Sequence, residues 1–382
     1  STQAKTLFPY TTLFRSRPLS LAGSAPERQD AAMANDVIIV GAGIAGLTVA
    51  RELRARGHAP LVLERSRGVG GRCATRRIDG QPVDHGLGFL HGSDPRFLAA
   101  LDAALAGSEA IEGWPIARDG EGTPCQPRAF GERGRRLVPR EGVSVFAKAL
   151  ARDTHVRTTA RVEAITLASD PAAGRAWDVT LEGGERLRTR ALVLTQPVPG
   201  ATALLEPLAA TEPGVREWLP LLGLVHVVPC LTVIARYGRA FGIPEWDAAY
   251  PAESDSIQVA LRDSAKRGPG AEPTLVIQAR PRWSRLHLKD APEGWARLLL
   301  EEAVRLWGAG VGAPATMQAH AWRHARVATG SELAAPLLRP LPGGALLGMA
   351  GDGFHEAGGA EGAHLSGLSL AARLHHALVT HI

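Results

Sequence analysis

The chain has few cysteines and few lysines for its 382 residues. The cysteines are too far apart for a disulfide framework or for a CxxC metal or redox pair, so we expect no metal site and a reducing, cytoplasmic compartment. They stand at Cys73, Cys125 and Cys230. Arginine carries almost all of the positive charge, because lysine is limited to Lys5, Lys148, Lys266 and Lys289.

Long uninterrupted apolar runs are also missing. The longest apolar stretch, residues 219–238, contains His226 and Pro229, and its β-branched residues predict a buried pair of strands rather than a membrane helix. The formal net charge of +5 is spread among acidic residues and forms no basic stripe with interleaved aromatics. We therefore expect neither a membrane nor a nucleic acid as partner.

The bulk composition is that of a globular protein, with 45% hydrophobic and 21% charged residues. Its length favours two domains, since single cores stop growing near roughly 250–300 residues. A Gly/Pro-rich segment, "KRGPGAEP" at residues 266–273, predicts an exposed loop.

The first residues do not resemble the rest of the chain. "LFPYTTLFRS", residues 7–16, is the translation of a widely used sequencing-library adapter, and Met33 stands just before the first expected strand. We therefore predict that residues 1–33 are a non-native or disordered leader. The alternative is an organelle transit peptide, which the arginines, serines and threonines there would fit. Mass spectrometry of the native protein distinguishes the two, because a chain that starts upstream of Met33 would contradict the first interpretation.

A strand, a tight glycine turn and a helix follow one another at residues 36–57. "DVIIV" is a short β-branched run, and Gly41, Gly43 and Gly46 follow it with GxGxxG spacing. In such a unit the first glycine permits the turn, the second lets a pyrophosphate approach the backbone, and the third lets the helix pack closely. The helix N-terminus, at Ile44 and Ala45, presents free N–H groups to the phosphates.

An acidic residue and a second glycine run extend this pattern. A second strand, "PLVLE", ends in Glu64, where a carboxylate accepts hydrogen bonds from the adenosine ribose hydroxyls. "RSRGVGGR" follows at residues 65–72, where an NAD enzyme would normally continue into its next helix. The second loop lets the chain fold back over a longer dinucleotide, and Arg72 can offer fixed donors to its pyrophosphate. The pattern therefore favours FAD over NAD, with Arg65, Gly71 and Arg72 among its ligands.

These elements resemble those of the large flavoprotein group that includes monoamine oxidases, protoporphyrinogen oxidase and phytoene desaturases. Within it, "LERSRGVGGRCATRR…DHG" is similar to the renalases and their bacterial relatives, for which "KSRGVGGRxATRR…DHGAQYF" is typical. The resemblance extends over nearly all of residues 34–382 and implies that the backbone at Val162 reads the adenine.

Near the end of the chain, "GALLGMAGDGFHEAGGAEGAHLSG" is similar to the closing flavin motif of this group. Asp352, after Gly351 at a strand end, can hold ribityl hydroxyls, and the N–H groups near Gly362 and Ala363 place a positive helix end beside the negative charge of reduced flavin. No cysteine lies in this region, so we expect non-covalent FAD.

The resemblance implies an α/β architecture with a Rossmann-type, doubly wound FAD domain. We expect a discontinuous FAD-binding domain made of residues 34–90, 136–210 and 340–382. A second α+β domain with a mainly antiparallel sheet, the substrate domain, would comprise residues 91–135 and 211–339.

The sequence departs from the renalase pattern where the resemblance places the substrate cavity. "DHGAQYF" becomes "DHGLGFL" at residues 84–90, and "HRWxYA" becomes "HAWRHA" at residues 320–325. The candidate catalytic residues of this cavity are Trp322, His324, Phe354 and His355. Each also has a plain structural interpretation, as a packed aromatic or a surface histidine.

The resemblance implies an FAD-dependent oxidase. Renalases oxidise off-pathway dihydro isomers of NAD(P)H by hydride transfer to flavin N5, and molecular oxygen then gives hydrogen peroxide. The partners would be a small-molecule substrate, a dihydronicotinamide, and oxygen. An FAD-dependent amine oxidase or another dehydrogenase is the first alternative, although the chain has few lysines and no evident tyrosine pair. A flavin-binding protein without turnover is the second alternative.

Overall fold

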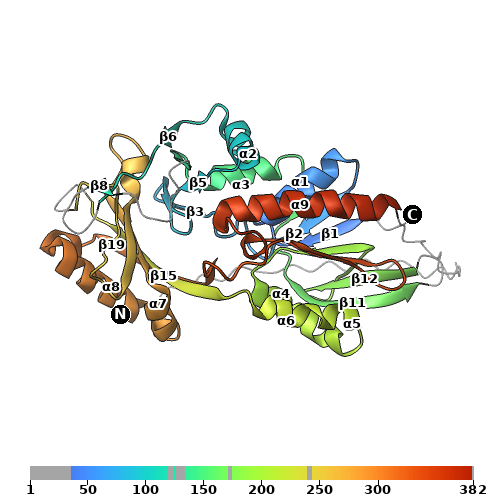
Figure 1. The fold of residues 1–382 in the computed structure, drawn as a ribbon. Coiled ribbons are helices and arrows are strands. Elements are labelled where there is room, and N and C mark those ends of the chain that lie inside the picture. Colours follow the sequence, from blue (N-terminus) through green and yellow to red (C-terminus); the bar gives the residue numbers. More distant parts are fainter. Residues whose placement is uncertain (1–35, 119–123, 126–133, 171–173, 239–242, 381–382) are drawn as a thin grey trace, which may run out of the picture. The chain divides into compact units, whose positions relative to one another are not determined.

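A computed structural model describes residues 36–118, 124–125, 134–170, 174–238 and 243–380 (Figure 1). The predicted leader, residues 1–33, lies outside the described residues.

A six-stranded sheet forms the first part of the fold, with strand order β10-β2-β1-β14-β21-β20. The central strands pair in parallel, and only the edge strand β20 runs antiparallel to its neighbour. The strands are β1 (Val37–Val40), β2 (Pro60–Leu63), β10 (His155–Arg157), β14 (Ala191–Leu194), β20 (Leu337–Pro340) and β21 (Leu346–Met349). Four of them are fully buried apolar runs, as expected for a parallel sheet covered on both faces. The expected Rossmann-type, doubly wound α/β fold is confirmed.

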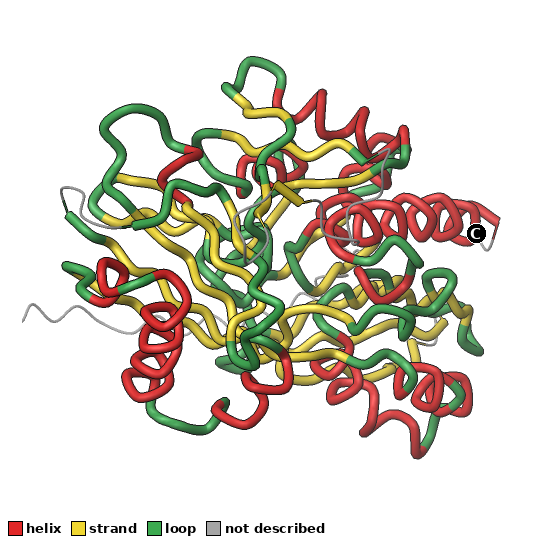
Figure 2. Tube along the Cα trace, turned by 60° about the vertical axis from the view of Figure 1, so that its left-hand side comes forward, coloured by secondary structure: helices red, strands yellow, loops and turns green. Residues whose placement is uncertain are grey.

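Two helices, α1 (Ile44–Ala55) and α9 (Gly359–Thr380), pack together beside this sheet, and α9 runs along it in both Figure 1 and Figure 2. Gly367 permits the close approach, since a Cβ there would lie 2.9 Å from the carbonyl oxygen of Ala45. Helix α1 ends as predicted beside Gly57, whose positive φ of 88° suits a helix end.

The opposite face of the sheet carries a three-stranded sheet and short helices. Trp177 of the small sheet is fully buried there, and its indole N–H donates to the carbonyl oxygen of Leu346 at 2.8 Å. The elements are β11 (Val162–Asp170), β12 (Gly174–Leu181), β13 (Arg186–Thr189), α4 (Val198–Leu205), η1 (Glu206–Ala210), α5 (Pro213–Arg216) and α6 (Trp218–Gly223).

A second, seven-stranded sheet has the order β19-β15-β18-β17-β16-β7-β8 and is mainly antiparallel, as expected. Its strands are β7 (Ala117–Arg118), β8 (Pro124–Cys125), β15 (Val227–Arg236), β16 (Ala248–Ala249), β17 (Ile257–Arg262), β18 (Thr274–Ala279) and β19 (Thr316–Val327). The associated helices are η2 (Asp263–Lys266), α7 (Pro281–His287), α8 (Pro292–Trp307) and η3 (Ala309–Gly312). Helix α8 packs its Trp295 and Leu299 into the core of this sheet.

One prediction for this region was wrong. Residues 219–238 do not form a strand pair, because helix α6 occupies their first part and the single strand β15 the second. Strand β15 finds its partners far away in the sequence, in β18 and β19. The β-branched residues indicated a buried strand but could not show that "LPLLG" ends a helix.

Most of the remaining elements lie between β2 and β10 in the sequence, and one, η4, lies between β21 and α9. They are β3 (Thr75–Ile78), β4 (Gln81–Asp84), β5 (Leu90–Gly92), α2 (Pro95–Leu105), β6 (Ala110–Glu112), β9 (Arg135–Pro139), α3 (Ser144–Ala151) and η4 (Asp352–Phe354). We keep the discontinuous domain division as a proposal. Strand β20 pairs in the six-stranded sheet, and α2 packs on α3 and α9. We therefore propose that the FAD-binding domain also includes α2 and all of β20.

Candidate functional site

The two glycine-rich loops of the sequence meet in the fold. The backbone N–H of Gly70 donates to the carbonyl oxygen of Ala42 at 2.8 Å. A Cβ on Gly71 would lie 3.7 Å from the Cα of Gly43, so a larger residue would crowd the gap between the loops. No described atom lies within 4 Å of a Cβ placed on Gly43 itself, which leaves the backbone there open to a ligand.

Gly41 and Gly46 have different tasks in the first loop. Gly41 has a φ of 110°, which L side chains rarely adopt. Its carbonyl oxygen would lie only 2.1 Å from a Cβ on Gly46, so helix α1 can approach the strand only with glycine there. The helix begins at Ile44 and Ala45, both buried, directly beside the open space at Gly43.

Glu64 lies at the end of β2 and holds this first loop. Its carboxylate accepts hydrogen bonds from the backbone N–H of Ala42 at 2.9 Å and of Ser66 at 2.8 Å. The segment before Val162 runs beside it, because the N–H of Ala160 donates to the carbonyl oxygen of Glu64 at 2.8 Å. The predicted adenosine ligands Glu64 and Val162 therefore come from neighbouring segments, and each carboxylate oxygen keeps a lone pair for a ribose hydroxyl.

Arg72 and Asp352, predicted for the pyrophosphate and the ribityl chain, form a direct pair. The two guanidinium nitrogens each donate to one carboxylate oxygen at 2.7 Å, the bidentate geometry that arginine favours. Burial alone would lower the pKa of Arg72, but the Asp352 carboxylate raises it, so the guanidinium stays charged. The same guanidinium reaches the carbonyl oxygen of Ala325 in β19, 3.4 Å away.

The closing motif has the expected strand, loop and helix. Gly351 follows β21, and the hydroxyl of Ser366 in α9 bonds both the N–H and the carbonyl oxygen of Gly351, at 3.1 and 2.8 Å. Gly362 and Ala363 lie in the first turns of α9 and are buried. Gly41, Glu64 and Gly351 follow β1, β2 and β21, so the first glycine loop, the Glu64 carboxylate and the closing motif lie at the same edge of the parallel sheet. The predicted ligand Arg65 is exposed directly after Glu64.

Two of the four candidate catalytic residues fit their predicted role poorly. Phe354 is 1% exposed and belongs to the hydrophobic core, so it does not face an open cavity, and we remove it from the set. His355 lies at the following turn, where its Nδ1 accepts a hydrogen bond from the N–H of Ala357 at 3.2 Å. Its geometry is that of a turn-stabilising residue.

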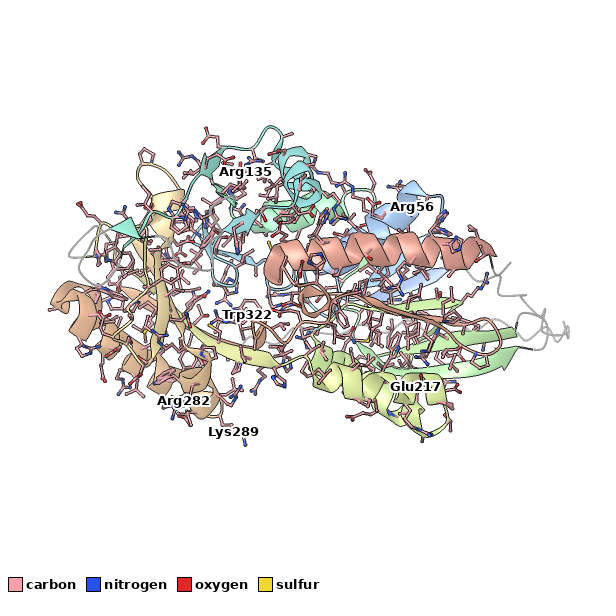
Figure 3. All side chains as sticks on the ribbon, in the orientation of Figure 1. Arg56, Arg135, Glu217, Arg282, Lys289 and Trp322 are labelled. Atoms are coloured by element: carbon pink, nitrogen blue, oxygen red, sulfur yellow. The ribbon has the colours of Figure 1, made fainter. Side chains whose placement is uncertain are left out.

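The other two, Trp322, which Figure 3 labels, and His324, lie two residues apart on β19. Side chains of a strand alternate between its two faces, so every second residue shares a face. Five half-buried residues have this spacing, and we call them the β19 face: Gln318, His320, Trp322, His324 and Arg326. The pairing with β15 is irregular between Trp322 and Arg326, which includes the His324 position.

The β19 face meets His85 of the DHG segment. The indole N–H of Trp322 donates to the carbonyl oxygen of His85 at 3.0 Å, and the His85 ring lies 5.1 Å from the ring of His320. The Nδ1 of His85 is buried and has no hydrogen-bond partner among the described residues. Arg76 adds its charge at the edge, donating to the side-chain oxygen of Gln318 at 2.8 Å.

The imidazoles of this site are held neutral. Burial, and then the charges of Arg76 and His320, lower the pKa of His85 to about 4. The pKa of His324 is also lowered, by burial and then by the charges of Arg65, Arg72 and Arg323. The site therefore combines uncharged aromatic rings with several arginine charges at pH 7.

Sequence reasoning missed His85, His320, Arg76 and Gln318 as site residues. The signal was present, since polar or aromatic residues stand at every second position of "QAHAWRHAR", and alanine at all but one of the positions between them. Gln196, after β14, was missed as well. Its side-chain oxygen is buried without a partner in the described part of the chain, and its backbone N would lie 3.2 Å from a Cβ on Gly41.

The described residues contain no cluster of three or more histidine, cysteine, aspartate or glutamate side chains arranged to hold a metal ion. Cys73 is buried and its thiol donates to the carbonyl oxygen of Val143 at 3.1 Å. Burial raises the pKa of this thiol, so it remains protonated, as expected for a packed side chain. Among the helices of the described segments, none has both the length and the apolar character of a membrane span.

Acid is expected to destabilise the fold through two buried imidazoles. The pKa of His85 and that of His364 are each lowered from 6.5 to about 4, in both cases mainly by burial. The unfolded chain binds protons near pH 6.5 and the folded chain only near pH 4, so this stability is present above pH 6.5 and lost as the pH falls. At pH 5 the two together cost roughly 4 kcal/mol, which lowers Tm by about 5 °C relative to pH 7 for a chain of this size.

Thermal unfolding at pH 5 and pH 7 measures this loss. His364, which bonds the Thr48 hydroxyl at 2.9 Å, is the better site to vary, because it lies outside the β19 face. In His364→Gln the Tm difference between the two pH values should shrink by about half. His376→Gln, at an exposed position of the same helix, is the control. Equal pH dependence in His364→Gln and the wild type would contradict the assignment.

Two known sequence families match this chain. Residues 39–104 match the family described as "NAD(P)-binding Rossmann-like domain", and residues 103–375, more than half of the chain, match "Flavin containing amine oxidoreductase". AofH of Mycobacterium tuberculosis, which bears the name of a flavin-containing monoamine oxidase, is 40% identical over 105 residues, 28% of this chain and 22% of that one. Putrescine oxidase of Kocuria rosea is 34% identical over 98 residues, 26% of this chain and 20% of that one. The chain thus spans about a fifth of the length of these curated relatives.

Solved structures of flavin amine oxidases share the fold. Cyclohexylamine oxidase from Brevibacterium oxydans superimposes with a TM-score of 0.63 at 16% identity, covering 90% of this chain and 99% of that one. Putrescine oxidase bound to putrescine gives a TM-score of 0.62 at 14% identity, covering 89% and 98%. At this identity the likeness concerns the fold alone. The open glycine backbone at Gly43, the Glu64 carboxylate and the Arg72–Asp352 pair fit a flavin dinucleotide. The chain belongs to the flavin-containing amine oxidoreductase family, and its cofactor is FAD.

Proposed function

We propose that this chain is a renalase-like, FAD-dependent oxidase that oxidises dihydro isomers of NAD(P)H which carry their hydride at the wrong ring position. The observation that carries the proposal is the β19 face, where neutral imidazoles and an indole are surrounded by arginine charges. A dihydronicotinamide presents a flat uncharged ring and phosphate groups, and both match these surroundings.

In this proposal non-covalently bound FAD would supply the hydride acceptor, at its N5, and a route for two electrons to oxygen. The substrate loses one C–H bond with its electron pair, and its ring becomes an aromatic pyridinium without releasing a proton. Oxygen takes the two electrons together with two protons and becomes hydrogen peroxide. Hydride transfer of this kind needs proximity and alignment more than an acid or a base.

The residues of the β19 face would therefore bind and orient the substrate. Trp322 and the neutral rings of His85 and His320 pack edge to face or tilted against one another and would give the dihydropyridine aromatic, uncharged surroundings. They would place no positive charge beside the pyridinium product. Arg76, which bonds Gln318 and is paired with no carboxylate in any described contact, would hold a phosphate group.

The alternative, an amine oxidase, is favoured by the names of the relatives. Against it stands the charge of the site, because a protonated amine would meet Arg65, Arg72 and Arg76. The carboxylate that contacts this group, Asp352, is already paired with Arg72 at 2.7 Å. Within the described residues Lys148 and Lys289 are exposed, and Lys266 is enclosed in a buried ion cluster.

Peroxide formation in air tests the proposal. The 2- and 6-dihydro isomers of NAD(P)H should each give one hydrogen peroxide and one NAD(P)⁺ per molecule consumed, whereas putrescine and cyclohexylamine should give none. Peroxide from an amine alone would establish the alternative on the same fold. If the protein binds FAD but no compound of this panel gives peroxide, a flavin-binding protein without turnover remains.

A further inference from the structure

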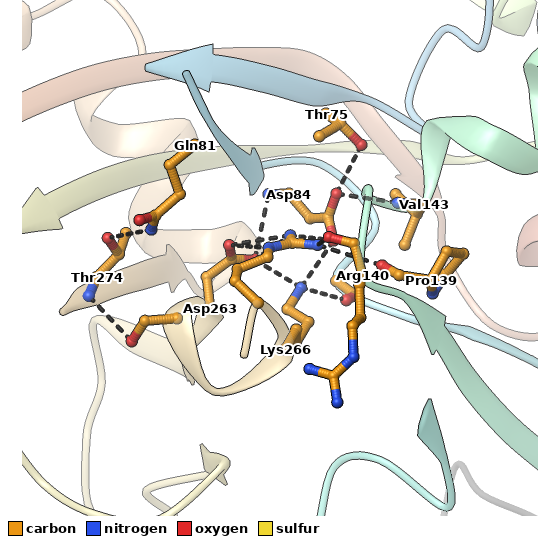
Figure 4. A network of polar contacts seen from close by, with 12 residues as sticks. Thr75, Gln81, Asp84, Pro139, Arg140, Val143, Asp263, Lys266 and Thr274 are labelled. Atoms are coloured by element: carbon orange, nitrogen blue, oxygen red, sulfur yellow. Dashed lines mark hydrogen bonds and ion pairs between the residues drawn. The ribbon is translucent and has the colours of Figure 1, made fainter. Parts of the chain in front are cut away.

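Four charged side chains are fully buried beside the DHG segment, and they form what we call the charge tetrad (Figure 4). The exposed fraction of the side chain is 0% for Asp84, Asp263 and Lys266 and 3% for Arg267. Two positive and two negative charges cancel, which is what makes such burial tolerable. The position of Lys266 corrects the prediction of an exposed loop at residues 266–273, since the loop proper begins only after Arg267.

Every donor of Lys266 is engaged. Its Nζ lies 2.9 Å from the Asp84 carboxylate and 2.6 Å from that of Asp263. Its third hydrogen bond goes to the carbonyl oxygen of Gly88, at 2.7 Å. All three N–H groups of this ammonium are engaged and it has no lone pair, so Lys266 cannot act as an acid or a base on a substrate.

The tetrad joins two segments that are far apart in the sequence. Asp84 ends β4, whereas Asp263 and Lys266 belong to η2 after β17. The backbone N–H of Asp84 donates to the Asp263 carboxylate at 3.1 Å. Burial alone would raise the pKa of Asp84, but Lys266 and Arg267 lower it below its ordinary value. The Asp84 carboxylate is therefore ionised at neutral pH.

The segment between these anchors, residues 84–88, forms one wall of the candidate site. It is bonded at its start through Asp84 and at its end through Gly88, and in between His85 lies against Trp322. The carbonyl oxygen of Gly86 accepts from the side chain of Gln278 at 2.6 Å. The backbone N–H of Leu87 also donates to the carbonyl oxygen of Arg72, at 2.9 Å. The tetrad adds anchors at the two ends of this segment, at Asp84 and at Gly88.

We propose that Lys266 is a positioning residue: through its bonds to Asp84, Asp263 and Gly88 it fixes residues 84–88 against the β19 face. The inference concerns the geometry of the site and holds for any substrate that the site takes. It predicts that loss of the lysine misplaces His85 even when the fold and the charge balance are kept.

Two variants separate positioning from plain stability. Lys266→Met removes all three hydrogen bonds and leaves a net negative charge in the core, so it should lower Tm strongly. Asp263→Asn combined with Lys266→Met restores the charge balance of the remaining Asp84 and Arg267. Lys289→Met, at an exposed lysine that Figure 3 labels, is the matched control.

The holoprotein with ¹³C-labelled histidine provides a readout that needs no substrate. In the wild type and in Lys289→Met, the His85 resonance should not titrate between pH 5 and 8, because its pKa is lowered to about 4. In the double variant we expect Tm to recover while the His85 pKa rises toward 6.5 and flavin reduction by the best substrate slows about ten- to a hundredfold. His85→Asn assigns the resonance.

Recovery of Tm together with an unchanged His85 titration and normal flavin reduction would overturn the proposal, since the tetrad would then be a stability element alone. A double variant that does not fold would also count against it, because the lysine would be required for the fold itself. If the dihydro isomers of NAD(P)H do not reduce the flavin, the titration of His85 still tests the positioning role of Lys266.

Discussion

Alanine at Gly46 and alanine at Gly43 are expected to fail for different reasons. A Cβ at Gly46 would lie 2.1 Å from the carbonyl oxygen of Gly41 and 2.6 Å from the hydroxyl of Thr195. Because the first of these atoms is backbone, helix α1 must move as a whole. We expect Gly46→Ala to cost about 3 kcal/mol or more of unfolding free energy and to lower Tm by at least about 4 °C.

Gly43→Ala should leave the apoprotein almost unchanged, since no described atom lies within 4 Å of the new Cβ and φ at this position is −77°. The methyl group would instead occupy the space through which the pyrophosphate approaches. We expect the dissociation constant of FAD to rise at least about a hundredfold, which corresponds to about 3 kcal/mol.

Thermal unfolding of the apoproteins and titration with FAD measure the two effects separately. Gly68→Ala, at an exposed glycine of the second loop with open space around its Cβ, is the control that should change neither quantity. Wild-type FAD affinity in Gly43→Ala would contradict the placement of the pyrophosphate at the first loop.

Removal of Arg72 should have the second large effect. Arg72→Ala takes away both donors of the Asp352 carboxylate, which is 8% exposed, and leaves a buried charge without a partner. Breaking a buried pair in this way costs about 3–5 kcal/mol. FAD occupancy should fall as well, because the guanidinium lies between the second glycine loop and the closing motif.

A second substitution distinguishes these contributions. Arg72→Ala combined with Asp352→Asn removes the unpaired charge and should recover most of the lost Tm, whereas FAD affinity should stay low. Arg56→Ala, at a surface pair with Glu52, is the control and should change the unfolding free energy by less than about 1 kcal/mol. A double variant that is as yellow as the wild type would show that the pair is structural and does not contact FAD.

The cofactor end of the site could be predicted because its physics is local. Gly41, Gly43, Gly46 and Glu64 are needed within one strand, turn and helix, and their spacing follows from that unit. The meeting of the two glycine loops could also be expected, since only a few residues separate the second strand from the second loop.

The substrate end could be predicted only in part. Trp322 and His324 came from a resemblance, although alternation along β19 would have added His320 and Gln318. Phe354 was wrong because a residue next to a ligand-binding aspartate can equally point into the core. The charge tetrad was invisible in the sequence, because Asp84 and Lys266 meet across 182 positions and the neighbouring glycines and proline indicated a loop.

The central claim is that neutral aromatic rings surrounded by arginines make this site bind dihydronicotinamides. Anaerobic mixing in a stopped-flow instrument tests it. Flavin absorbance would be followed after mixing with the 2- and 6-dihydro isomers of NAD(P)H, ordinary NADH, putrescine and cyclohexylamine. We predict fast bleaching with the isomers alone. Bleaching by an amine, with none by the isomers, would contradict the account and assign the β19 face to amine oxidation.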